Sequence, residues 1–267
     1  MKKIITLLKC ILYALALAGA QYLIALLMIL YKVFMLGVSY DDAINTVFGA
    51  ETVTVTYLAA ILLIVFVWLL SKICRQRFAD FIAWGEKPRW YMYYLCITLG
   101  IGANLWTSAM VQSVFSQSSI EEYNAASSNL TANVSILSII GIALFVPVME
   151  EIIFRGIILS RLSKIMPVAA AVIVQGVVFG IMHGDPVWIA YAVFMGIVLG
   201  YVRIYTNSLL VPIIVHIAYN YSSPMGSLME YIFMNSRYPH LPALLIGAVM
   251  MAFSLITMKM WKDEETK

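Results

Sequence analysis

The chain has 267 residues, of which 63% are hydrophobic and 12% are charged, and its mean hydropathy is +0.91. Soluble globular proteins are about half apolar and about a quarter charged, so this composition excludes an ordinary soluble domain and predicts a membrane protein. The net charge of +3 is too small to indicate a nucleic-acid partner, and the three cysteines show no spacing typical of a disulfide framework or a cysteine metal site.

Eight apolar segments follow one another along the chain, each close to the ~20 residues that a helix needs to cross a bilayer. They are 10–36, 52–71, 90–113, 132–160, 167–183, 187–203, 208–222 and 240–260. No linker, low-complexity segment or internal repeat divides them. We therefore expect an all-α polytopic membrane protein, in which residues 1–267 form a single integral membrane domain with about eight transmembrane helices.

The basic residues lie in alternate loops between these segments, and this alternation predicts the topology. The loops "GVSYDDAINTVFGAE" and "VQSVFSQSSIEEYNAASSN" contain no Lys or Arg, and Arg237 is the one basic residue on their side. Cytoplasmic loops carry the excess of Lys and Arg, so both termini are predicted to be cytoplasmic and the number of spans even. The expected location is the cell membrane.

A few polar side chains interrupt the apolar segments of the second half of the chain. A charged side chain at membrane depth costs at least ~2.5–3.5 kcal/mol on insertion scales, so it is usually paired and functional. The residues concerned are Glu150, Glu151 and Arg155 in the fourth segment, His183 at the end of the fifth, and His216 and Asn220 in the seventh. His240, in an outer loop, is interpreted as solvated.

Helical spacing assigns these side chains to faces. Glu151 and Arg155 are four residues apart, so they share a face and can form an ion pair. Glu150 is rotated by about 100° from Glu151, which directs it away from the arginine and leaves it free to act as a base. His216 and Asn220 are also four apart and share a face. At a rise of about 1.5 Å per residue, the three segments bring their polar groups to similar depths in the membrane.

Three short motifs in this region resemble those of a known family. "EEIIFR", "FGIMH" and "HIAYN" match, in order and spacing, the motifs E-E-x-x-x-R, F-x-x-x-H and H-x-x-x-N of the CAAX protease and bacteriocin-processing family of intramembrane endopeptidases. The family includes type II CAAX prenyl proteases and bacteriocin self-immunity proteins. The resemblance covers residues 130–222, which we expect to contain the catalytic core motifs.

The resemblance implies that the protein hydrolyses a peptide bond within the membrane. Glu150 would act as the general base that activates water, helped by His183, while His216 and Asn220 would stabilise the oxyanion of the tetrahedral intermediate. The chemistry is reasonable, because hydrolysis needs a base and hydrogen-bond donors placed where negative charge develops. The implied substrate is a hydrophobic or lipidated peptide, such as a CAAX-type tail, a leader or pheromone peptide, or a bacteriocin.

The remaining motif residues have supporting roles in this resemblance. Glu151 and Arg155 would hold the site in shape, and Phe179 belongs to the second motif. Glu150, His183 and His216 would be the ligands if the enzyme used zinc. We expect no obligatory cofactor, because Arg155 would compete with a metal for Glu151 and the chain has no H-E-x-x-H helix.

Two functions of other classes remain open at this stage. A small ion- or proton-coupled transporter would use the same buried Glu, Arg and His residues as a relay. Transporters of this kind often show inverted repeats and broken helices in both halves, whereas the ionisable groups here lie in the second half of the chain only. An inactive membrane scaffold is the other alternative. The expected partners are membrane lipids and the peptide substrate, with no nucleic acid.

Overall fold

The computed structural model describes residues 1–131 and 140–265, and within these residues all regular elements are helices. Five of them are long and apolar enough to cross a membrane. These are α1 (Lys2–Leu36), α3 (Thr52–Ile73), α5 (Trp90–Val114), α11 (Pro186–Thr206) and α14 (Leu241–Glu265). The prediction of an all-α polytopic membrane protein is therefore confirmed.

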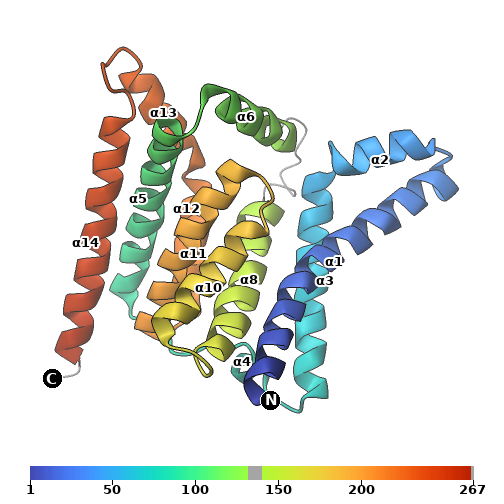
Figure 1. The fold of residues 1–267 in the computed structure, drawn as a ribbon, viewed down its shortest axis with the longest axis horizontal. Coiled ribbons are helices and arrows are strands. Elements are labelled where there is room, and N and C mark those ends of the chain that lie inside the picture. The colour runs from blue at the N-terminus through green and yellow to red at the C-terminus, as the bar shows by residue number, and fades with distance from the viewer. Residues whose placement is uncertain (132–139, 266–267) are drawn as a thin grey trace.

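Shorter helices complete the bundle and its connections (Figure 1). Two of them are apolar and pack against the long helices, α10 (Val168–Ile181) and α12 (Leu210–Tyr221). The connecting helices are α2 (Tyr40–Phe48), α4 (Phe78–Phe81), α6 (Gln117–Thr131) and α13 (Ser223–Phe233). Each of the eight predicted segments coincides with helix in the described residues, the fourth from residue 140 onward. The count of eight membrane crossings stays a prediction.

The fourth segment is continuously helical but is not a regular α-helix. It consists of η1 (Gly141–Phe145), α8 (Val146–Glu151), η2 (Ile152–Leu159) and α9 (Ser160–Leu162), where η1 and η2 are π-helical. Pro147 has no N–H to donate to the preceding turn, and a proline inside a helix often kinks it. The backbone instead widens, and the N–H of Val146 bonds to the carbonyl of Gly141. Such π-helical turns are frequent at functional sites.

The two ends of the chain lie at the same edge of the bundle. Figure 1 shows the N-terminus and the C-terminal end of α14 at the lower edge, while α6 and α13 lie at the upper edge. An even number of crossings requires this arrangement. That the lower edge faces the cytoplasm stays a prediction.

The outer helices expose apolar side chains, and the fourth segment forms the centre. Leu12 and Phe34 of α1 and Val249 of α14 are 64%, 77% and 68% exposed. Large exposed apolar surfaces of this kind suit contact with lipid. At the centre, Ile153 and Ile157 are completely buried in the largest hydrophobic cluster. The first motif therefore lies on a deeply buried part of the described bundle.

Glycines bring α10 and α11 into backbone contact. A Cβ atom on Gly196 would lie 2.7 Å from the Cα of Gly176, and one on Gly180 would lie 2.9 Å from the backbone nitrogen of Val193. Small residues spaced by four let membrane helices approach closely, and both helices carry such a G-x-x-x-G pattern. The close approach places the carbonyl of Gly196 beside the fourth segment.

Candidate active site

The residues predicted for catalysis surround one cavity of about 430 Å³ between α8, α10, α12 and α5. α8 contributes Glu150, the turn after α10 contributes His183, and α12 contributes His216 and Asn220. Segments that are distant in sequence thus deliver their polar groups to the same space, as the depth argument predicts. Phe179 also lines this cavity.

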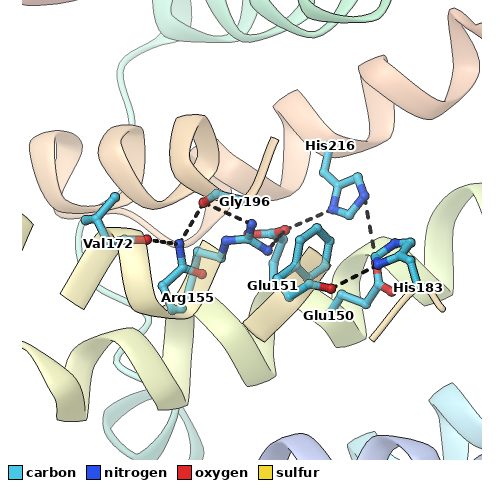
Figure 2. Close-up of polar contacts among 9 residues, drawn as sticks. Glu150, Glu151, Arg155, Val172, His183, Gly196 and His216 are labelled. Atoms are coloured by element: carbon cyan, nitrogen blue, oxygen red, sulfur yellow. Dashed lines mark hydrogen bonds and ion pairs between the residues drawn. The ribbon is translucent and has the colours of Figure 1, made fainter. Parts of the chain in front are cut away.

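Glu151 connects two of the motifs directly. Its Oε1 accepts a hydrogen bond of 2.7 Å from Nη1 of Arg155 and one of 2.9 Å from Nδ1 of His216 (Figure 2). Glu151 and Arg155 are fully buried, and His216 is 7% exposed. The predicted ion pair is therefore present, and the same carboxylate also fixes the histidine of the third motif, which helical spacing alone did not predict.

The bond to Glu151 sets the direction in which His216 faces. An ionised carboxylate only accepts hydrogen bonds, so Nδ1 of His216 carries the proton in this contact. The other ring nitrogen, Nε2, lies 3.7 Å from Oε2 of Glu150. The imidazole thus stands between the two glutamates, with Nε2 turned toward Glu150 and the cavity.

His183 is oriented by the backbone of its own helix. Its Nδ1 lies 2.9 Å from the carbonyl oxygen of Phe179, which can only accept, so Nδ1 carries the proton and Nε2 is the nitrogen left for other partners. Among the described residues, no direct hydrogen bond joins His183 to Glu150. A proton moving between these two groups would therefore pass through a molecule in the cavity they both line.

Phe179 is the packing centre of the site. Its ring stacks edge to face on His183, with centroids 4.9 Å apart, and lies 6.0 Å from the ring of His216. The guanidinium of Arg155 lies 4.4 Å from the same ring centroid, within the range of a cation–π contact. The phenylalanine of the second motif therefore touches elements of all three motifs.

Arg155 and Gln175 donate to the same backbone carbonyl, a contact that the sequence did not predict. Nη2 of Arg155 lies 3.3 Å from the carbonyl oxygen of Gly196, and Nε2 of Gln175 donates to the same oxygen at 2.7 Å (Figure 2). Both side chains are fully buried. The G-x-x-x-G patterns of α10 and α11 were the available signal, because they predict the close packing that brings this carbonyl inward.

The rest of the cavity wall includes a residue that the motifs do not contain. His240 lies in the turn before α14, is half-buried and lines the cavity. On the α5 side, the wall carries Asn104 and Thr107, and the hydroxyl of Thr107 lies 2.8 Å from that of Tyr219.

The donor set does not fit a zinc site as arranged. Glu150, His183 and His216 line one cavity, and each histidine keeps Nε2 available. Within residues 1–131 and 140–265, however, no three His, Cys, Asp or Glu side chains are gathered closely enough to hold a metal ion. Arg155 also forms an ion pair with the carboxylate of Glu151 and would compete with a metal ion for it. The mechanism proposed for this site therefore uses no metal ion.

Comparison with known protein families gives a match for the part of the chain that contains the site. Residues 132–222 match the family model described as type II CAAX prenyl endopeptidase, Rce1-like. Curated proteins and solved structures gave no further match. The matched segment contains all three motifs and the four predicted catalytic residues. Residues 132–222 are therefore similar to the Rce1-like type II CAAX prenyl endopeptidases, and this match supports the resemblance to the CAAX protease and bacteriocin-processing family.

Proposed function

We propose that the protein is an intramembrane endopeptidase that hydrolyses a peptide bond with water activated by Glu150. The observation that carries the proposal is the convergence of Glu150, His183, His216 and Asn220 on one cavity inside the helical bundle. A base and several hydrogen-bond donors around one cavity are what direct hydrolysis requires. No serine or cysteine nucleophile is needed.

Attack begins with a water molecule held between Glu150 and His183. The carboxylate of Glu150 takes a proton from this water, and Nε2 of His183 accepts the second water hydrogen and so orients the oxygen. The oxygen then forms a bond to the scissile carbonyl carbon, and the carbonyl becomes an oxyanion. General-base catalysis of this kind contributes about 10²–10⁴-fold to the rate.

The oxyanion is stabilised by donors on α12. The side-chain amide of Asn220 supplies one donor, and His216, whose ring Glu151 holds through Nδ1, supplies a second donor from Nε2 when the ring is protonated. Collapse of the intermediate breaks the C–N bond. Glu150 returns its proton to the leaving amine, so the carboxylate is regenerated and no group is left altered.

Glu151 and Arg155 are positioning residues in this proposal. Glu151 holds the ring of His216, and Arg155 balances the charge of Glu151 while its guanidinium contacts Phe179 and the carbonyl of Gly196. Each group is buried, so each orientation is fixed before substrate arrives. Preorganised donors of this kind cost no rearrangement at the moment of reaction.

The cavity extends toward the edge that carries α6 and α13. Tyr123 and Asn124 of α6, Glu230 of α13, and His240 lie on its wall. Figure 1 shows these two helices at the edge opposite the chain ends. With the predicted topology, that edge faces away from the cytoplasm. We therefore favour exported substrates, a leader or pheromone peptide or a bacteriocin in the cell membrane, over a CAAX-type tail in the cytoplasm.

Cleavage of a quenched fluorogenic peptide library by the purified, detergent-solubilised protein tests the proposal. Glu150→Gln is compared with wild type, and Glu122→Gln on α6 serves as the matched control because that glutamate is exposed and outside the cavity wall. Cleavage by wild type and Glu122→Gln, but not by Glu150→Gln, is expected. Equal cleavage by all three proteins would refute the proposed role of Glu150.

A further inference from the structure

A second cavity, of about 490 Å³, lies on the other side of the Glu151–Arg155 pair from the catalytic cavity. Arg155 lines it, together with residues of α4, α9, the end of α11 and the loops that join them. α4 lies at the lower edge of the bundle, near the N-terminus (Figure 1). This edge is the predicted cytoplasmic side, so the cavity lies at the level of that membrane surface.

Three cations on the wall of this cavity have no acidic partner. Arg161, Lys164 and Arg203 line it, and none of them forms an ion pair with another described residue. Among the described wall residues the one carboxylate is that of Asp80, which Arg77 already holds at 2.8 Å. The wall therefore carries an excess of positive charge.

Two of the guanidinium groups also have buried donors without partners. Arg203 is 6% exposed and donates from Nη2 to the carbonyl of Ala83, yet its Nε has no partner among the described residues. Arg155 is fully buried, and its Nε likewise has none in the part of the chain that the structure describes. A buried donor left unpaired is unfavourable, more so when it is charged, so these nitrogens point to a missing acceptor.

Arg161 is held in place by its surroundings. Its Nη1 donates to the carbonyl of Ile157, and its guanidinium lies 5.4 Å and 5.1 Å from the ring centroids of Tyr13 and Phe81. The side chain is therefore fixed at the cavity wall with donors to spare, since a guanidinium has five N–H groups. If Arg161 only set the membrane topology, a free charge at the surface would be enough. Its fixed side chain therefore indicates a further role.

We infer that the second cavity binds an anionic phosphate group. The planar guanidinium fork matches phosphate oxygens, and basic pockets between transmembrane helices at the cytoplasmic side bind phospholipid headgroups. The phosphate could come from an anionic lipid or from a soluble phosphate compound, and both present the same oxygens to Arg203 and Arg161. The inference does not depend on the hydrolytic activity proposed for the other cavity.

Lipid and phosphate binding to the full-length protein in detergent tests the inference. Native mass spectrometry compares retention of phosphatidylglycerol with that of phosphatidylcholine, and inorganic phosphate is titrated as a competitor. Lys164→Gln is the first variant, because Lys164 is exposed and its loss should leave the fold intact. Lys87→Gln is the matched control, an exposed lysine of the same predicted side that is not on the cavity wall. Arg203→Gln is the second variant.

We expect phosphatidylglycerol to be retained in preference to phosphatidylcholine, with about fivefold weaker affinity in Lys164→Gln and no change in Lys87→Gln. Competition by inorganic phosphate would identify the phosphate group alone as the ligand, whereas its absence would identify the lipid as the source. Equal weakening by Lys164→Gln and Lys87→Gln would overturn the inference, because surface charge alone would then explain binding. Equal retention of both lipids without any effect of phosphate would also overturn it.

Discussion

Glu151 and His216 are separated by 65 positions in the sequence, yet Nδ1 of the histidine lies 2.9 Å from Oε1 of the glutamate. This contact joins the first motif to the third. The adjacent residue, Glu150, faces the cavity with Oε2 3.7 Å from Nε2 of the same ring. Two neighbouring glutamates thus contact opposite nitrogens of one imidazole, and substitutions at the two positions should have different effects.

Glu151→Gln is expected to destabilise the protein. The substitution leaves the guanidinium of Arg155 fully buried without a counter-charge, and breaking one partner of a buried ion pair costs about 3–5 kcal/mol. Thermal unfolding in detergent measures the loss, with Glu122→Gln as the exposed control. A Glu151→Gln protein as stable as that control would show that the pair contributes little to the fold.

Glu150→Gln is expected to abolish activity without loss of stability. Glu150 has no bond to Arg155, and its side chain is 14% exposed toward the cavity, so the amide is accommodated. Loss of the base should lower kcat by about 10²–10⁴-fold. Peptide cleavage and thermal unfolding are measured on the same samples. Retained cleavage by Glu150→Gln would refute the role of Glu150 as the base. No cleavage and no ion flux in wild type would argue for a scaffold, and ion flux that Glu150→Gln loses, with no cleavage in wild type, would argue for a transporter.

The sequence predicted the contact between Glu151 and Arg155 better than it predicted the helix that carries them. Glu151 and Arg155 pair as their spacing indicates, because four residues bring side chains to one face. The wider π-helical turns around them were not predicted, since they depend on how Pro147 and the surrounding helices pack. The Glu151–His216 bond was missed for the same reason, because a tertiary contact decides it.

Gly196→Ala is expected to destabilise the protein and to weaken catalysis. The added Cβ would lie 2.7 Å from the Cα of Gly176, so α10 and α11 must separate, and overpacking of this kind typically costs about 1–3 kcal/mol. The movement would also shift the carbonyl that accepts from Arg155. Gly19→Ala is the control, because a Cβ there meets nothing within 4 Å. Thermal unfolding and kcat are compared; equal stability of both variants would contradict the packing argument.

Metal removal is expected to leave activity unchanged. Arg155 occupies Glu151, and the described residues present no group of three ligands, so water activation is assigned to Glu150 itself. Cleavage rates are measured before and after dialysis against a chelator, with metal content determined on the same sample. Activity that disappears on dialysis and returns with zinc would replace this mechanism with one in which Glu150, His183 and His216 bind the metal.

The catalytic cavity is expected to be reached from outside the cell. Ser227, on α13, is exposed and lies on the cavity wall, whereas the native Cys74 is exposed after α3, on the predicted cytoplasmic side. In intact cells expressing Ser227→Cys, a membrane-impermeant maleimide should label position 227 and should reach Cys74 only after permeabilisation. Cys10 and Cys96 are buried and should not react. The reverse pattern, with Cys74 labelled first, would invert the topology, place the cavity mouth in the cytoplasm and favour a CAAX-type tail as substrate.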